Sequence, residues 1–144
     1  MCWVTYKEKY LKRKTAEKDI KVKKLLERDQ LGNLSSPIFE FNWRIGKIHV
    51  SSIDKPRICP DMNMTICWQI NKGLHSCKHM AMTKHWVYCY STWWFIPVYV
   101  NYVKLLNAKP IGVNYKIYEA IIPKGSKYYV NEHGEYVSDK LIIL

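Results

Sequence analysis

This sequence has few acidic residues, few glycines and no closely paired cysteines. Its 144 residues include 12 Asp and Glu against 23 Lys and Arg, so the formal net charge is +11. The six glycines are scattered and form neither a dinucleotide-binding motif nor a P-loop, which excludes the common Gly-rich phosphate loops. Any phosphate recognition would therefore use Lys and Arg side chains, and a field of this sign attracts polyanions by long-range steering.

The five cysteines form an odd set without a CxxC pair, and the first residues carry no apolar segment of the kind that directs secretion. We therefore expect reduced thiols and a cytoplasmic protein. No GxSxG motif is present, and Cys77 neighbours histidines only along the sequence. The spacing consequently does not predict a cysteine hydrolase.

A residue content that is 48% hydrophobic and 24% charged is typical of a folded soluble chain. We expect a basic N-terminal arm over residues 1–14 and one globular domain over residues 15–144. The fold class predicted is α+β and mainly β: a single compact domain with a mostly antiparallel sheet, a C-terminal hairpin and one or two short helices.

Segments rich in β-branched and aromatic residues predict most of the sheet. A long surface loop is expected over residues 51–64, and residues 74–82 are expected to open a helix with Ser76 as its N-cap. The predicted strands before the C-terminal region lie at residues 3–6, 20–26, 38–45, 48–50 and 65–70.

The last thirty residues have the clearest pattern. Residues 115–122 are apolar on both faces of an extended chain, which predicts a central strand. The turn at residues 123–126 contains Pro and Gly, and residues 127–130 and 135–138 are predicted to pair around the four-residue loop 131–134. The apolar end, residues 141–144, is expected to lie within the sheet.

An uncharged stretch covers residues 86–103 and reaches the minimum length of a membrane span. Pro97 and the many Tyr and Trp residues favour two buried strands instead, split near Pro97 or at Ser91 and Thr92. We therefore expect no membrane insertion.

The candidate contacts to a phosphate-bearing ligand are basic residues and one aromatic face, because ammonium and guanidinium groups pair with phosphate and indole rings stack on bases. The predicted ligand-binding residues are Lys21, Lys23, Lys24, Trp43, Arg44, Lys72, His75 and Lys78. An alternative zinc cluster would combine two thiolates with two imidazoles, although their spacing matches no common zinc motif. Its candidate ligands are Cys67, His75, Cys77 and His79.

Several short segments together resemble a family of small uncharacterised proteins from gut Bacteroidota and their phages. The resemblance implies a cytosolic setting and a phage-encoded accessory role, and it carries no activity. The segments that carry it are residues 1–3, 16–20, 45–47, 73–76, 121–129 and 135–139.

A more remote resemblance connects the late strands with ADP-ribosyltransferase-like folds. Residues 118–126 followed by 134–137 are similar to a strand that ends in Pro-x-Gly before a catalytic Glu. The resemblance implies Glu135 as the catalytic carboxylate, NAD as cofactor, and residues 74–76 near the family's Ser-Thr-Ser strand. The first core strand departs from the family because it carries three lysines where the family has an Arg or His that holds NAD.

We expect first a small non-enzymatic protein that recognises a phosphate-bearing ligand, either a nucleotide or a nucleic acid. Following the resemblance, it would be a phage or prophage accessory factor that acts on a host pathway. The alternatives are an ADP-ribosyltransferase-like enzyme that uses Glu135, and a module that binds a host protein through the aromatics of residues 86–103. If Glu135 is not catalytic, we expect it to be an exposed hairpin residue.

Overall fold

The computed structural model describes residues 3–36, 41–60, 66–82, 87–89, 92–94 and 114–144. In this part of the chain, nearly all regular structure is strand, and the one helical element is a single 3-10 turn, η1, at Glu8–Tyr10. The mainly-β prediction is confirmed, whereas the predicted short helices are not. The strands are β1 (Trp3–Thr5), β2 (Lys14–Thr15), β3 (Ile20–Arg28), β4 (Leu34–Ser35), β5 (Asn42–Trp43), β6 (Ile48–Val50), β7 (Arg57–Pro60), β8 (Ile66–Ile70), β9 (Leu74–Cys77), β10 (Met80–Met82), β11 (Val87–Cys89), β12 (Thr92–Trp94), β13 (Asn114–Ile122), β14 (Lys127–Val130), β15 (Glu135–Ser138) and β16 (Lys140–Ile143).

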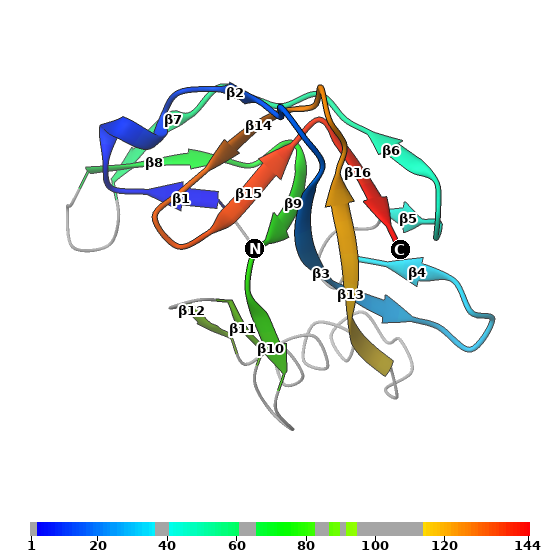
Figure 1. Cartoon of the computed structure of the whole chain (residues 1–144). Coiled ribbons are helices and arrows are strands. Elements are labelled where there is room, and N and C mark those ends of the chain that lie inside the picture. The colour runs from blue at the N-terminus through cyan, green and yellow to red at the C-terminus, as the bar shows by residue number, and fades with distance from the viewer. Residues whose placement is uncertain (1–2, 37–40, 61–65, 83–86, 90–91, 95–113) are drawn as a thin grey trace.

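The described strands form three sheets with antiparallel ladders (Figure 1). The largest has the order β2-β14-β15-β9-β3-β13-β16-β6, with β4 pairing to β3 and β5 pairing to β4. A second sheet, β1-β8-β7, lies beside the β14–β15 hairpin, and β10, β11 and β12 form the third. The mostly antiparallel architecture is therefore as predicted.

The longest ladder joins β3 to β13 over nine residue pairs, from Ile20 with Ile122 to Arg28 with Asn114. Because β13 also pairs with β16, its backbone is hydrogen-bonded on both edges, and the predicted central strand is confirmed. Along β3, the residues facing inward are Val22, Lys24 and Leu26. This alternation has the two-residue period of an extended chain, as the sequence predicts.

Within the described residues, buried apolar side chains gather in two clusters. The first lies against the inner faces of β3, β13 and β16 and includes Val22, Leu26, Trp43, Leu141 and Ile143. The second joins the small sheet to the hairpin through Trp3, Ile70, Tyr129 and Val137. Strand β1, predicted near the N-terminus, thus pairs with β8 and buries its tryptophan completely.

The C-terminal region folds as its sequence predicts. Strands β14 and β15 pair around Asn131–Gly134, and Gly134 has a φ of 71° at the end of the loop. The Asn131 side chain organises the loop, because its Oδ1 accepts the backbone N–H groups of His133 (3.0 Å) and Glu135 (2.9 Å). Strand β16 then lies between β13 and β6, which confirms the apolar end as part of the sheet.

Two predictions of local structure are wrong. Residues 74–82 form the strands β9 and β10 instead of a helix, since Leu74–Cys77 is extended by its pairing to β15. The predicted loop 51–64 contains the strand β7, which pairs with β8. Within residues 86–103, β11 and β12 lie on either side of positions 90–91, near one of the two predicted breaks, and the remainder falls outside the described residues.

Candidate ligand site around Lys24

Strand β9 pairs with β3 through one residue pair, Lys23 with Cys77. It pairs with β15 over four residues. The backbone N–H of Lys78 donates to the Gly134 carbonyl at 2.8 Å, so Lys78 belongs to a hydrogen-bonded pair with the β15 side. Because such pairs alternate along an antiparallel ladder, His75 and Cys77 direct their backbone groups toward β3.

The amino group of Lys24 bonds to the carbonyl that β9 presents to β3. Its Nζ donates to the carbonyl oxygen of His75 at 2.5 Å and lies 5.2 Å from the centre of the Trp43 ring. Lys24 is 9% exposed, and its neighbours on the same face, Val22 and Leu26, belong to the first apolar cluster. A lysine in such surroundings is uncommon, since burial of an ammonium group carries a large desolvation cost.

Burial lowers the pKa of Lys24 from its usual value to about 8. It also lowers the pKa of His75 to about 4, an effect that the positive charge of Lys24 reinforces and the hydrogen bond to the Asn71 carbonyl opposes. The His75 ring therefore stays neutral near pH 7, and its Nε2 lies 2.8 Å from the Asn71 oxygen, which assigns the proton to Nε2. The site thus combines a cation with a neutral imidazole.

Among the residues that the structure describes, two buried polar atoms near this cluster have no hydrogen-bond partner. Ser76 is 1% exposed, and continuing the β3–β9 register by one residue places it opposite Lys24 on the same face. The second atom is Nδ1 of His49, whose Nε2 accepts the backbone N–H of Arg44 at 2.9 Å. The His49 ring lies 4.7 Å from that of Trp43. Neither Ser76 nor His49 was among the predicted binding residues. The sequence pattern alone does not distinguish a buried serine in a strand from the N-cap of a helix.

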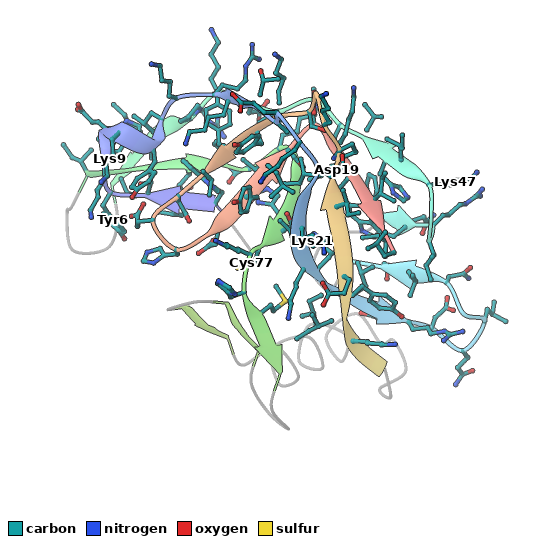
Figure 2. All side chains as sticks on the ribbon, in the orientation of Figure 1. Tyr6, Lys9, Asp19, Lys21, Lys47 and Cys77 are labelled. Atoms are coloured by element: carbon teal, nitrogen blue, oxygen red, sulfur yellow. The ribbon has the colours of Figure 1, made fainter. Side chains whose placement is uncertain are left out.

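Of the eight predicted ligand-binding residues, the structure brings together Lys24, Trp43 and His75. Lys21 and Lys23 lie on the opposite face of β3, where the Lys23 ammonium is 3.8 Å from the Glu119 carboxylate. Figure 2 shows Lys21 near the middle of the large sheet. The remaining three are exposed at separate places: Arg44 after β5, Lys72 before β9 and Lys78 after β9.

Trp43 is 5% exposed and packs as part of the core. Its ring contacts Phe41 at 4.6 Å and His49 at 4.7 Å between centres, and its Nε1 donates to the Ser36 hydroxyl at 2.9 Å. The Trp43 indole is therefore part of the core packing beside the Lys24 ammonium.

Glu135 is buried, with 6% of its surface exposed, so the expectation of an exposed hairpin residue is wrong. The Trp3 indole donates to its carbonyl at 3.0 Å, a contact between segments far apart in sequence. The register places Glu135, Cys77, Lys23 and Glu119 in one row across β15, β9, β3 and β13. Glu135 and Lys23 thus share a face but are separated by the strand that carries Cys77.

The alternative zinc cluster has no counterpart among the described residues, in which no three His, Cys, Asp or Glu side chains are grouped as metal ligands. Strand β9 is extended, so His75 and His79 do not share a helical face. Cys77 is disulfide-bonded, and the other half of that bond lies outside the described side chains. The prediction of reduced thiols is therefore wrong for Cys77, while Cys67 is buried and not in a disulfide.

Acid is expected to destabilise the fold through His75. Its pKa of about 4 in the folded protein is below the usual 6.5, so the stability it contributes is present above about pH 6.5 and is lost as the pH falls through 4. Between pH 7 and pH 4.5, the wild type should lose about 1–2 kcal/mol more than His75→Gln, a value reduced for partial exposure of the ring. Urea unfolding at both pH values measures it.

The matched control for this experiment is His79→Gln, which removes an exposed imidazole four residues further on. It should retain the acid sensitivity of the wild type. An unchanged acid sensitivity in His75→Gln would contradict the prediction.

No family model, no curated protein and no solved structure matches this chain. Within the residues that the structure describes, no helix has the length and the apolar character required to cross a membrane.

Proposed function

We propose that this chain is a small, basic, non-enzymatic binding protein for a phosphate-bearing ligand, either a nucleotide or a nucleic acid. The observation that carries the proposal is positive charge that the fold leaves largely unneutralised. Within the described residues, one Lys or Arg side chain lies within 4.0 Å of a carboxylate, in the pair Lys23–Glu119. Lys21, Arg44, Lys72 and Lys78 are exposed.

Exposed cations of this kind support electrostatic attraction of phosphate groups, which weakens as salt competes for both partners. The buried cation at Lys24 adds a positive charge beneath the surface of β3 and β9. A cytoplasmic location and a role as a phage or prophage accessory factor, acting on a host pathway, belong to the same proposal. The accessory role rests on the resemblance alone, and the disulfide at Cys77 lends the cytoplasmic location no support because disulfides persist in oxidising compartments.

Neutralising the exposed cations is expected to weaken ligand binding. The triple variant Lys21→Gln, Lys72→Gln, Lys78→Gln should bind a labelled single-stranded oligonucleotide at least about tenfold more weakly, and its slope of log affinity against log salt should fall by about 2 to 3. Fluorescence anisotropy between about 50 and 200 mM salt, with a labelled ATP analogue as a second arm, measures both quantities and separates nucleic acid from nucleotide.

The control is a triple variant with the same charge change at dispersed exposed positions, Lys9→Gln, Lys47→Gln, Lys124→Gln. Figure 2 shows Lys9 and Lys47 on opposite sides of the molecule from each other. An equal loss of affinity in both triple variants would show that the effect depends on net charge alone. Binding whose affinity does not change with salt concentration would contradict the proposal.

The second proposal is an ADP-ribosyltransferase-like enzyme. The observation in its favour is the burial of Glu135 on the face of the sheet that also carries Lys23. Cys77 stands between the two, and the Lys23 ammonium lies 3.8 Å from the Glu119 carboxylate. Turnover of NAD that Glu135→Gln abolishes would favour this enzyme over the binding protein.

The third alternative, a host-protein module, was predicted from the aromatics of residues 86–103. Their side chains fall outside the described residues, and the prediction stays as it was.

A further inference from the structure

Strand β6 is the last strand of the large sheet among the described residues, with β16 on one side (Figure 1). The Ser51 N–H donates to the Asp139 carbonyl at 2.9 Å, and the register continues through His49 with Leu141. Hydrogen-bonded pairs alternate in an antiparallel ladder, so His49 bonds toward β16. The backbone N–H and C=O groups of Ile48 and Val50 therefore point away from β16, toward the open edge.

The side chains of this edge are unusually apolar for their exposure. Ile48 is 59% exposed and Val50 is 66% exposed, while His49 between them points inward to Trp43. Edge strands usually carry charged residues or proline, which discourage pairing with another chain. A further exposed apolar residue lies beside β6, because Ile45 forms a bridge with Ile143 next to the strand end. The exposed apolar residues at this edge are Ile45 (60%), Ile48 (59%) and Val50 (66%).

The same outer face continues inward across the sheet. Ile48 is the partner of Ile142, Ile121 is the partner of both Ile142 and Lys21, and the four residues form one row across β6, β16, β13 and β3. Ile121 and Ile142 are half-buried, so the row is an apolar stripe that ends in a cation. Contiguous apolar residues on the outer face of a sheet often mark a surface that binds another molecule.

Positive charge borders the stripe. Arg44 and Lys47 are exposed in the turn before β6, and Lys140 is the partner of Val50. None of the three pairs with a carboxylate within 4.0 Å in the part of the chain that the structure describes. The nearest acid in sequence, Asp139, uses its Oδ1 to accept the Lys127 N–H at 2.9 Å. An incoming segment would therefore gain by carrying negative charge.

We propose that β6 is a docking edge for an extended acidic segment of another protein, which adds to the sheet as a further strand. Its backbone pairs with Ile48 and Val50, its apolar side chains lie on the stripe, and its alternating carboxylates are attracted to the exposed Arg44 and Lys47 in the turn before β6. Main-chain hydrogen bonds supply affinity in this mode and alternate side chains supply specificity. A second copy of this chain is the less suitable occupant, because it brings the same cations to the same edge.

The inference is independent of the phosphate-binding proposal, because a nucleic acid uses neither the open backbone groups nor the apolar stripe. A double variant Ile48→Thr, Val50→Thr keeps β-branched side chains and removes exposed apolar surface. A double variant Arg44→Gln, Lys47→Gln removes charge and leaves the stripe. Both change exposed positions, so thermal unfolding should remain close to that of the wild type.

The probe is a labelled peptide of alternating valine and glutamate, measured by fluorescence anisotropy. We expect saturable binding to the wild type, a loss of at least about tenfold in each double variant, and loss of binding when alternate peptide nitrogens are methylated, because methylation removes the pairing N–H groups. A peptide with lysine in place of glutamate should not bind. Oligonucleotide binding should be unchanged in Ile48→Thr, Val50→Thr.

Three binding results would each overturn the inference: no saturable binding of the acidic peptide, equal affinity in wild type and both variants, or equal affinity for the methylated peptide. Sedimentation that shows a dimer abolished by Ile48→Thr, Val50→Thr would also overturn it, since the edge would then belong to a second copy.

Discussion

Gly73→Ala is expected to destabilise the protein by about 3 kcal/mol or more. Gly73 has a φ of 142°, a backbone conformation that L side chains rarely adopt. A Cβ at this position would overlap Cγ2 of Val137, which is fully buried in the second apolar cluster. Backbone strain and overlap with a core side chain therefore add together, and urea unfolding monitored by tryptophan fluorescence measures the loss.

The control is Gly46→Ala. Gly46 also has a positive φ, 77°, but nothing lies within 4 Å of the position its Cβ would occupy. Only the strain remains, so a loss of about 1 kcal/mol is expected. If the two substitutions cost the same, the packing of Gly73 against β15 is not as described. The comparison matters for the candidate site because Gly73 leads directly into β9, which carries His75 and Ser76.

The second large effect is a gain of stability in mild alkali that depends on Lys24. Its pKa is about 8 in the folded protein and 10.5 in its usual environment, so the unfolded chain holds this proton more tightly. Stability therefore rises as the pH increases from below 8 toward 10.5. Between pH 7 and about pH 9.5, this one group should add about 2 kcal/mol to the free energy of unfolding.

Lys24→Met keeps the length of the side chain and removes the titrating group. The variant should lack the alkaline gain, and the difference between the two proteins in urea unfolding at each pH isolates Lys24 from other groups that titrate in this range. Lys23→Met, which changes the neighbouring and more exposed residue on the other face, should retain the gain. The same alkaline gain in wild type and Lys24→Met would show that Lys24 is not buried as an amine.

Much of the sheet was predictable because its signals are local. In an extended chain Ile20, Val22 and Lys24 fall on one side, and Val22 and Lys24 are both buried in the structure. Pro and Gly at residues 123–126 predicted where β13 ends. The loop Asn131–Gly134 was equally readable, since Asn131 accepts two N–H groups within four residues of itself. The prediction failed at residues 74–77, because Ser76 reads locally as the N-cap of a helix. Pairing with Glu135–Ser138 overrides that preference.

The candidate site depended on contacts that no local pattern contains. The Lys24 amino group bonds to a carbonyl 51 residues away, and the indole of Trp3 reaches the backbone of Glu135 across 132 residues. Sequence reasoning placed Lys24, Trp43 and His75 among the candidates by chemical type, but it could not distinguish them from the five that lie elsewhere.

The sequence by itself determined the class of fold, the central strand, the C-terminal hairpin and the excess of positive charge, because these follow from alternation, turn residues and composition within short stretches of chain. Tertiary structure alone decided which lysine is buried, that Glu135 is covered, and that Ile48 and Val50 are left at an open edge. Those outcomes depend on which strands become neighbours, and neighbours in an antiparallel sheet are chosen by burial summed over the whole chain.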